Sequence, residues 1–405
     1  MTHRKRLLAA LLAGAMTCAL TACGGGTAPD AQQGSEPVGT PAAGPTDWEA
    51  SAGILNTDDT DDALYEAAKA EGKVTIYSIS ARIHKIAESF MEKYPGVTVE
   101  AFDISTNELL EKVTREFDAD VHNADLIHIK DQDGTIYNEY IAEKKFYNYR
   151  PADILSHIDE AYSTYSTPLY IELTQVYYNN EKYPDAAPVE NLWDLTKPEW
   201  NGRVMIQNPM DNLSWSSWLT ALCTGDGPAL MEQAYRDAFG EALVLSEGCE
   251  NAGYEWVKRL KENNPMFAAS DGEICEAVGT RGQSDPPIGI FSSVKFRKAA
   301  ENDWALQPLC LAPTGGLPSI NTLYVIAGCE HPNAAKLLMR YMMGGVDGDL
   351  TGYENFNTLG GWPVRDDIAP PEGQQPLDEI SLLTFDPQVI YENIGTFQDF
   401  WTMLS

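Results

Sequence analysis

Positive charge is scarce in this sequence. Its 405 residues include 28 Lys and Arg against 60 Asp and Glu, which gives a formal net charge of −32 at pH 7. A protein that neutralises nucleic-acid phosphates or adheres to an anionic membrane surface needs a basic face. We therefore expect no nucleic-acid partner and no general electrostatic attraction to membranes.

The short motifs of common catalytic sites are also absent. The sequence contains no GxSxG elbow, no HExxH, no GxxxxGK[ST] loop and no CxxC pair. A pair of carboxylates can act as acid and base without any such motif, so a secreted surface hydrolase stays a lower alternative. We expect a protein that is not an enzyme and that needs no cofactor.

Long apolar runs are confined to the first residues. A basic head precedes an apolar run from Leu7 to Leu20, which is too short to span a membrane and is typical of a secretory signal. The ending Leu20-Thr21-Ala22-Cys23 resembles a bacterial lipobox, whose cysteine becomes lipidated. We expect a signal peptide at 1–22 and an extracytoplasmic lipoprotein anchored to the cell membrane through Cys23. A plain cleaved signal is the alternative.

The stretch after Cys23 has almost no apolar bulk. It reads GGGTAPDAQQGSEPVGTPAAGPTD, a composition that cannot bury a core, so residues 23–50 are predicted to form a flexible linker. The remaining body exceeds the size that one core normally serves, which predicts two lobes. We place the boundaries as follows: 51–170 first part of lobe 1, 171–310 lobe 2, 311–370 return to lobe 1, and 371–405 a C-terminal helical segment of undecided lobe.

Cysteine usage gives little guidance. Apart from Cys18 and Cys23, an odd number of cysteines remains without paired ligand spacing: Cys223, Cys249, Cys275, Cys310 and Cys329. One or two disulfides are plausible outside the cytoplasm. The pair Cys223 and Cys249 is our candidate, and buried free thiols are an equally good interpretation.

The body alternates strands with amphipathic helices. The stretch VTIYS at 74–78 precedes a helical pattern, VTVEAFDIS at 97–105 precedes a second one, and ADLIHIKD at 124–131 follows as a third strand. Such alternation predicts an α/β fold with parallel strands and right-handed crossovers. In such sheets ligands bind beyond the carboxyl ends of the strands, close to helix N-termini.

Several segments together resemble one family of transport proteins. LWDLTKPEWNGRV, DALYEAAKAEGKVTIYS, AESFMEKYPGVTVEA, PPIGIFSSVKF, CEHPNAAKLLMRYM and NTLGGWPVRDDI resemble, in their order, segments of ABC-importer solute-binding proteins of the ferric-iron branch. The resemblance implies a two-lobed class II periplasmic-binding-protein-like fold, in which each lobe is a mostly parallel sheet flanked by helices. It also implies two extended segments that cross between the lobes, near 167–179 and 307–322.

The resemblance implies a function as well. Proteins of this family capture a small solute in the cleft between the lobes and deliver it to a membrane permease driven by an ATPase. We therefore expect a monomer with a small-molecule solute, an ABC permease and its ATPase as partners. A sensor lipoprotein that docks on a signalling receptor is an alternative that the sequence does not separate from an importer component.

Candidate ligand residues follow the first two strands. Ser78, Ser80 and Arg82 lie at the first strand-to-helix turn, where hydroxyls, N–H groups and a guanidinium could meet an oxyanion. Thr106 and Asn107 hold the same place at the second turn. Helix capping by the serines is an even alternative at the first turn.

The resemblance adds residues from the second lobe. By family position, the loop with Asn212, Ser214 and Trp215 and the loop with Ser292 and Ser293 line the cleft. The two adjacent phenols of TQVYYNN, Tyr177 and Tyr178, lie on the first crossing segment. Neighbouring side chains of an extended strand point to opposite faces, so we expect one phenol in the cleft and the other packed in a lobe.

Ferric iron is the alternative ligand. Iron-binding relatives use two adjacent tyrosines in the loop that here reads Phe291-Ser292-Ser293, where this chain has none. His84, Tyr177 and Tyr178 are the alternative ferric ligands. The serines, Arg82 and Lys295 instead favour a polar or anionic organic solute, so we expect no metal. The very acidic surface leaves a cationic solute as a weaker alternative.

Overall fold

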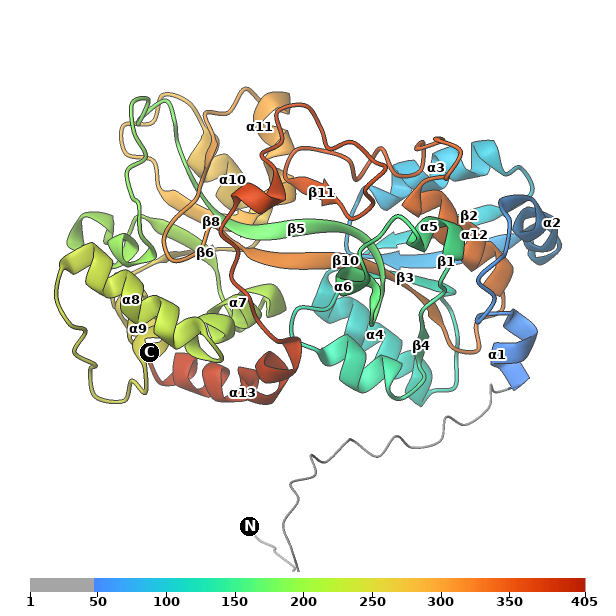
Figure 1. Cartoon of the computed structure of the whole chain (residues 1–405), viewed down its shortest axis with the longest axis horizontal. Helices are drawn as coiled ribbons and strands as arrows, with labels where there is room; N and C mark the ends of the chain where they lie inside the picture. The colour runs from blue at the N-terminus through green and yellow to red at the C-terminus, as the bar shows by residue number, and fades with distance from the viewer. Residues whose placement is uncertain (1–46, 405) are drawn as a thin grey trace, which may run out of the picture. The chain divides into compact units, whose positions relative to one another are not determined.

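The computed structural model describes residues 47–404, which belong to one compact unit (Figure 1). The signal peptide and the lipid-modified cysteine predicted at 1–23 lie outside the described residues, as does the linker up to residue 46. Residues 47–50, predicted as the end of the flexible linker, instead form the start of the helix Asp47–Ala52, in which Glu49 is buried. Among residues 47–404, no helix has the length and apolar character that a membrane crossing requires.

One mixed sheet of eleven strands runs through this unit. Eight of them follow the order β2-β1-β3-β10-β5-β8-β6-β7, and the other three, β4, β9 and β11, pair with β10 or β5 off this path. The strands are β1 Lys73–Ser78, β2 Thr98–Asp103, β3 Leu126–Lys130, β4 Phe146–Tyr147, β5 Thr167–Tyr178, β6 Val204–Gln207, β7 Met266–Ala268, β8 Ile288–Ser292, β9 Gln307–Leu309, β10 Leu317–Ile326 and β11 Gly361–Pro363.

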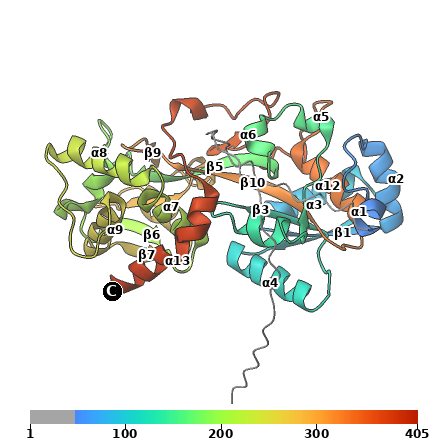
Figure 2. The same ribbon diagram turned by 60° about the horizontal axis from the view of Figure 1, so that its bottom comes forward.

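Helices cover both faces of the sheet. The α-helices are α1 Asp47–Ala52, α2 Asp61–Glu71, α3 Ile83–Lys93, α4 Thr106–Asp118, α5 Ala152–Leu155, α6 Glu160–Ser163, α7 Leu213–Cys223, α8 Gly227–Phe239, α9 Ala252–Glu262, α10 Asp271–Gly279, α11 Arg297–Glu301, α12 Pro332–Met343 and α13 Pro387–Met403. A π-helix, η1 Ile136–Ile141, and the 3-10 helices η2 Leu192–Thr196, η3 Pro198–Trp200, η4 Ser293–Lys295 and η5 Leu377–Glu379 complete the set. Figures 1 and 2 place α4 on the opposite side of β1 from α3.

The two ends of the sheet are parallel and its centre is antiparallel. At one end β1 pairs in parallel with β2 and β3, and at the other β6 pairs in parallel with β7 and β8. The long strands β5 and β10 run antiparallel to each other between these ends. β5 occupies the first predicted crossing segment, whereas β10 overlaps the second one only at 317–322, because it begins ten residues after 307 and extends four residues beyond 322. The predicted fold class is confirmed.

Local sequence explains several helix ends. Thr60 accepts a hydrogen bond from the Ala63 N–H at 3.3 Å and starts α2, which ends at Gly72 with φ of 79°. At α4, Glu108 accepts hydrogen bonds from the backbone and the side chain of Ser105, which forms a capping box. This capping fixes the first turn of α4 where it meets the cleft.

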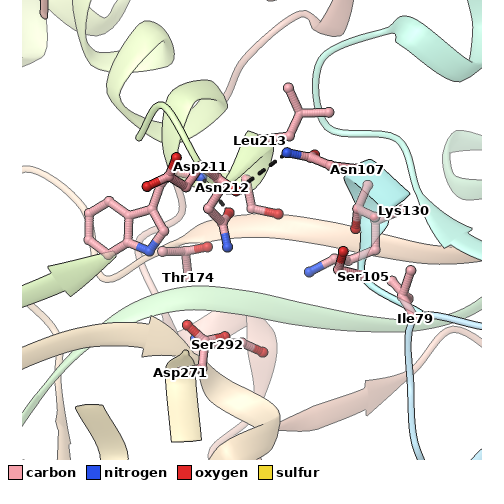
Figure 3. Close-up of a pocket in the computed structure, with 13 residues that line it drawn as sticks. Ile79, Ser105, Asn107, Lys130, Thr174, Asp211, Asn212, Leu213, Asp271 and Ser292 are labelled. Atoms are coloured by element: carbon pink, nitrogen blue, oxygen red, sulfur yellow. Dashed lines mark hydrogen bonds between the residues drawn. The ribbon is translucent and has the colours of Figure 1, made fainter. Parts of the chain in front are cut away.

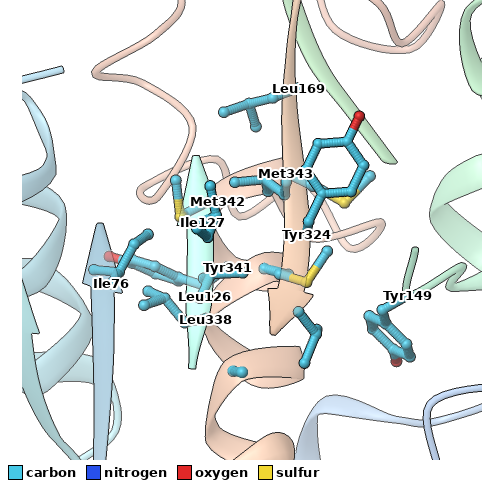
Figure 4. Packing of buried hydrophobic residues seen from close by; sticks show 14 of the residues in the cluster. Ile76, Leu126, Ile127, Tyr149, Leu169, Tyr324, Leu338, Tyr341, Met342 and Met343 are labelled. Atoms are coloured by element: carbon cyan, nitrogen blue, oxygen red, sulfur yellow. The ribbon is translucent and has the colours of Figure 1, made fainter. Parts of the chain in front are cut away.

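Apolar side chains form two large clusters at the two ends of the sheet. The first packs α12 against β1 and β3, with Ile76, Leu126 and Met342 fully buried (Figure 4). The second contains the buried indoles of Trp193, Trp215, Trp218 and Trp256. We call the parts around these clusters the first and second lobes. The C-terminal helix α13 contributes Ile390, Phe397 and Trp401 to the second cluster.

The cysteines of residues 47–404 are free thiols. Cys310 is exposed, and Cys223, Cys249, Cys275 and Cys329 are buried. The candidate disulfide between Cys223 and Cys249 is therefore not formed in this structure. Both residues are buried free thiols, which is the alternative interpretation.

Candidate ligand-binding cleft

Two adjoining cavities, each of about 200 Å³, open between the lobes. They share Ile79, Lys130, Asp271 and Ser292, so they form one continuous cleft. The first cavity is lined mainly by the starts of α4 and α7 (Figure 3). The second is lined by the turn after β1, by β5 and by the segment that follows β8.

Several helices begin at this cleft. α4 starts at Thr106 and α7 at Leu213, and both residues or their neighbours line the first cavity. Asn212 caps α7 by accepting a hydrogen bond from the Trp215 N–H at 3.2 Å. A helix N-terminus carries partial positive charge and free N–H groups, which favour an anion.

A buried ion pair forms the floor of the cleft. The Lys130 ammonium donates to the Glu172 carboxylate at 2.8 Å, and the side chains of Ser292 and Asn321 donate to the same carboxylate at 2.8 and 3.0 Å. Burial by itself raises the pKa of Glu172, but the charge of Lys130 and these hydrogen bonds outweigh it and lower the pKa to about 2. Glu172 is thus a fixed anion that holds Lys130 in place.

Arg82 is held in position at the second cavity. Its guanidinium donates to the Tyr170 hydroxyl at 2.7 Å, to the Ser80 hydroxyl at 3.0 Å and to the Asn355 carbonyl at 3.2 Å. Its central carbon lies 4.8 Å from the centroid of the Phe356 ring. A guanidinium held on three sides is preorganised to meet an oxyanion.

Two further cations follow β8. Lys295 and Arg297 line the second cavity, and burial lowers the pKa of both side chains. The ammonium of Lys295 makes no hydrogen bond or ion pair with any residue of 47–404 in this structure. It is the cation of the cleft that is free to contact a ligand directly.

Carboxylates balance these cations. Asp103, Glu172, Asp211 and Asp271 line the cleft beside Arg82, Lys130, Lys295 and Arg297. Asp271 accepts hydrogen bonds from the Gln207 side chain and from the Ser292 N–H, and burial raises its pKa. The cleft therefore holds acids and bases in equal number, whereas the whole chain has 60 acids and 28 bases.

One hydrogen bond crosses the mouth of the first cavity. The side-chain amide of Asn107, on α4, donates to the backbone carbonyl of Asp211, in the loop before α7, at 3.3 Å (Figure 3). α4 belongs to the first lobe and α7 to the second. The contact links the lobes in the described conformation.

The structure brings most of the predicted ligand residues together. Those that line the cleft are Ser80, Arg82, Thr106, Asn107, Asn212, Ser214, Trp215 and Ser292. Trp215 is 2% exposed and also packs edge-to-face on Trp218, at 5.3 Å between ring centroids. Its indole therefore serves the core as well as the cavity wall.

Two predicted serines do not line the cleft. Ser78 is fully buried and its hydroxyl lies 2.8 Å from Nδ1 of His128. The hydroxyl of Ser293 donates to the Gly360 carbonyl at 2.5 Å and accepts from the Leu173 N–H at 2.9 Å. Both side chains join neighbouring segments: Ser78 at the end of β1 and Ser293 at the start of η4.

The prediction that one adjacent phenol faces the cleft is wrong. Tyr177 is 1% exposed and stacks on Phe291 at 4.3 Å, while Tyr178 packs against the second cluster beside Tyr183. Both faces of β5 are covered at this end, so the two phenols point to opposite faces and each packs against a hydrophobic cluster. His84 is exposed on α3 and also lies outside the cleft. The alternative ferric ligands are not assembled.

The prediction missed the residues of the cleft floor. Tyr170, Glu172 and Thr174 follow one another at every second position of β5 and all line the cleft. A polar residue at every second position of an otherwise apolar strand is a readable signal. No such pattern marks Lys130, Asp271 and Asn321, and Arg297 follows Lys295 by two positions.

One group of side chains within residues 47–404 has the spacing of a metal site. His157, Asp366 and Asp367 lie together on the surface, away from the cleft. Asp367 is already paired with Arg365 at 2.7 Å, and His157 lies 3.1 Å from Asp366. These contacts account for the short distances within the group without a metal ion.

A family comparison matches most of the chain. The family described as bacterial extracellular solute-binding protein matches residues 85–377. No curated protein matches the sequence.

Solved structures share the fold at low identity. Iron-bound HitA from Pseudomonas aeruginosa has a TM-score of 0.61 and 15% identity, covering 82% of this chain and 99% of its own. AfuA from Actinobacillus pleuropneumoniae, with fructose-6-phosphate bound, has a TM-score of 0.62 and 16% identity, covering 82% and 98%. Apo ferric ion-binding protein A from Pasteurella haemolytica has a TM-score of 0.57 and 15% identity, covering 82% and 98%. At such identities the likeness shows the two-lobed fold alone.

Proposed function

Because the chain belongs to the family of bacterial extracellular solute-binding proteins, we propose that its cleft captures a small anionic organic solute for an ABC importer. The observation that carries the proposal is the second cavity, where Arg82, Lys295 and Arg297 face one space. Helix N-termini add partial positive charge beside it. A carboxylate or phosphate group bound here would contact the cations and lie near the helix N-termini.

The size and polarity of the cleft suggest the kind of solute. Hydroxyl and amide groups of Ser80, Thr106, Asn107, Asn212 and Ser214 surround the cations, and they could bind the hydroxyls of a sugar-like body. AfuA, which shares the fold, holds fructose-6-phosphate. A phosphorylated or carboxylated metabolite with several hydroxyls is the ligand class that we propose.

The family also places the protein outside the cytoplasm, with a small-molecule ligand and an ABC transporter as partner. We propose that it is a monomer anchored to the membrane by a lipid on Cys23, with the predicted linker as a tether that ends where α1 begins. Its role in this family is transport without catalysis.

Ferric iron is a second candidate ligand. HitA binds iron with the same fold, and Tyr170, Glu172 and Asp271 supply a phenol and carboxylates to this cleft. Against iron, the Tyr170 hydroxyl already contacts Arg82 and the Glu172 carboxylate is already paired with Lys130, which leaves Asp271 as the one of the three without a hydrogen-bonded cation. Organic anions are therefore favoured.

The ligand can be identified directly. Protein purified without refolding would be denatured, and the released small molecules identified by mass spectrometry, with thermal-shift screening of sugar phosphates, carboxylates and ferric citrate in parallel. A ligand at 100 times its Kd stabilises the protein by about 2.7 kcal/mol. Stabilisation by ferric salts alone, with a charge-transfer colour, would contradict an organic anion.

A matched pair of variants tests the cationic cavity. Lys295→Gln removes the uncommitted cation, and Lys298→Gln removes a cation of α11 that does not line the cleft. We expect K295Q to weaken binding of the identified anion at least tenfold and K298Q to leave it within twofold. Equal effects of the two variants would count against direct contact by Lys295.

A further inference from the structure

A separate cavity of about 520 Å³ lies between the first lobe and the start of α13. We call it the back cavity. Its wall includes Asp131, Tyr137, Tyr162, Tyr165, Tyr324 and Asp386. Figures 1 and 2 both place α13 at the border between the lobes. The volume falls in the range of about 300–1,000 Å³ that small-molecule sites occupy.

The back cavity lies behind the cleft, across one strand. Ile320, Thr322 and Tyr324 of β10 line it, whereas Asn321, between them, lines the cleft. Successive side chains of a strand point to opposite faces of the sheet. The crossing strand β10 thus separates two cavities and contributes to both.

The charge of the back cavity is opposite to that of the cleft's cationic end. Its lining residues include the carboxylates of Asp131 and Asp386 and no Lys, Arg or His. Asp386 uses one oxygen to accept from the Gln388 N–H at 2.9 Å, which caps α13. The carboxylate of Asp131 accepts from the N–H groups of Ile136 and Tyr137 at 3.3 and 2.9 Å. No side-chain cation lining the cavity offsets either acid.

Aromatic rings form the mouth of the back cavity. Tyr137 and Tyr165 are 41% and 64% exposed, and their rings meet edge-to-face at 5.1 Å and 68°. Tyr162 lies partly buried beside them and Tyr324 forms part of the floor. Tyrosine faces attract cations, and exposed rings gain from covering by an apolar frame.

We propose that the back cavity binds a small organic cation, an amine carried on an apolar or aromatic frame. The ammonium would lie near Asp131 and Asp386, and the frame would lie against the tyrosines. Burial raises the pKa of Asp131 to about 7, so a bound cation would supply the counter-charge that this carboxyl lacks. The proposal concerns a site apart from the cleft and does not depend on which solute the cleft takes.

Charge selectivity tests the chemistry of the site. The mature protein would be titrated with phenethylamine and with 3-phenylpropionate, which carries a carboxylate on the same frame, by calorimetry. We expect saturable binding of phenethylamine and binding of 3-phenylpropionate at least tenfold weaker. Absence of saturable phenethylamine binding, or equal binding of the two compounds, would overturn the proposal.

Paired variants test the location. Ala161→Arg adds bulk and positive charge at the exposed rim of the back cavity, and Ala142→Arg makes the same change at an exposed alanine outside it. We expect A161R to weaken phenethylamine binding at least tenfold and A142R to leave it within twofold, with both variants showing the circular dichroism of the wild type.

A second pair keeps the test independent of bulk. Asp386→Asn retains a side chain that caps helices well but removes the charge, and Asp185→Asn removes an exposed charge elsewhere. We expect D386N to weaken phenethylamine binding at least threefold and D185N to leave it unchanged. Phenethylamine binding that neither A161R nor D386N weakens would show that the amine binds elsewhere and would refute the assignment.

Discussion

Glu172 shows how a single buried charge organises the cleft. Its side chain is 6% exposed and accepts from Lys130, Ser292 and Asn321, which come from β3, β8 and β10. Strands from both lobes therefore meet at one carboxylate. Removing one partner of a buried pair leaves the other charge uncompensated, which costs more than the pair contributes.

We expect Glu172→Gln to destabilise the fold. The glutamine fills the same volume but leaves the Lys130 ammonium, 15% exposed, without an anion. The free energy of unfolding, measured by urea denaturation, should fall by about 3 kcal/mol. Glu88→Gln, on the exposed side of α3, should change it by less than about 0.5 kcal/mol. If E172Q left the free energy of unfolding unchanged, the ion pair of Glu172 and Lys130 would not stabilise the fold.

The acid dependence of stability should follow the same residue. The pKa of Glu172 is about 2 in the folded protein and about 4.3 in an unfolded chain. A lowered pKa means that the contribution is complete above about pH 4.3 and is lost as the pH falls through about 2. The stability difference between wild type and E172Q should therefore shrink between pH 5 and pH 2. A difference that stays constant over this range would contradict the ionised state of Glu172.

At the residue scale, sequence predicted polar groups that follow strands and missed those within them. Arg82 and Asn107 were predicted because they lie at turns, where a ligand meets free N–H groups, and Asn212 because the resemblance places its loop in the cleft. Lys130 and Glu172 lie inside or at the end of strands, and only pairing across the sheet shows that they meet. Sequence patterns carry periodicity along one segment and no register between distant segments.

At the scale of elements, a close backbone approach joins the second-lobe loop to the C-terminal part of the first lobe. Gly360 has φ of 85°, and a Cβ there would lie 1.8 Å from the Ser293 carbonyl oxygen. The Ser293 hydroxyl donates to the carbonyl of the same glycine. This contact holds η4, which carries Lys295 to the cleft.

We expect Gly360→Ala to destabilise the protein more than its backbone angle explains. Gly373 has a similar φ of 80° with nothing within 4 Å of a Cβ, so Gly373→Ala isolates the strain of the angle alone. G373A should lose about 1 kcal/mol and G360A about 1–3 kcal/mol more, measured by chemical denaturation. If both variants lost the same free energy of unfolding, the segment at Ser293 would be able to move away from the added Cβ without cost.

The crossing strands show where prediction from sequence succeeds and where it stops. β5 falls where the resemblance places the first crossing, and β10 overlaps the second one only at 317–322. The facing of Tyr177 and Tyr178 was wrong because β5 is buried on both faces beyond Thr174. Alternation along a strand gives two faces and does not say what covers each.

At the scale of the whole folded unit, the two lobes meet through few direct polar contacts outside the crossing strands. Asn107 donates to the Asp211 carbonyl at 3.3 Å on the cleft side. On the α13 side, Asn138 donates to Gln388 at 2.9 Å and the Tyr391 hydroxyl donates to Glu139 at 3.1 Å. A few hydrogen bonds of this kind can decide the balance between open and closed arrangements of the lobes, since a ligand shifts the population toward the state that it fits.

We expect Asn107→Ala to lower the population of the conformation in which this hydrogen bond links the lobes. The apparent Kd for the cleft ligand should rise about threefold to tenfold, because the apparent affinity scales with the fraction of binding-competent molecules. Stopped-flow kinetics should show the change chiefly as faster release. Glu111→Ala, on an exposed turn of the same helix, should leave both values unchanged, and a similar effect of this control would point to α4 itself instead of the interlobe contact.

The shared strand β10 predicts coupling between the cleft and the back cavity. Asn321 holds Glu172 in the cleft, while the flanking Ile320 and Thr322 face the back cavity, so an amine that shifts β10 changes both surfaces together. We expect saturating phenethylamine to change the affinity for the cleft ligand by at least threefold. Linkage then requires the cleft ligand to change the affinity for phenethylamine by the same factor. Calorimetric titrations in both orders measure the two factors. A factor of one in both orders would mean that β10 behaves as a rigid wall, because two ligands on opposite faces of a strand that does not move cannot sense each other through it.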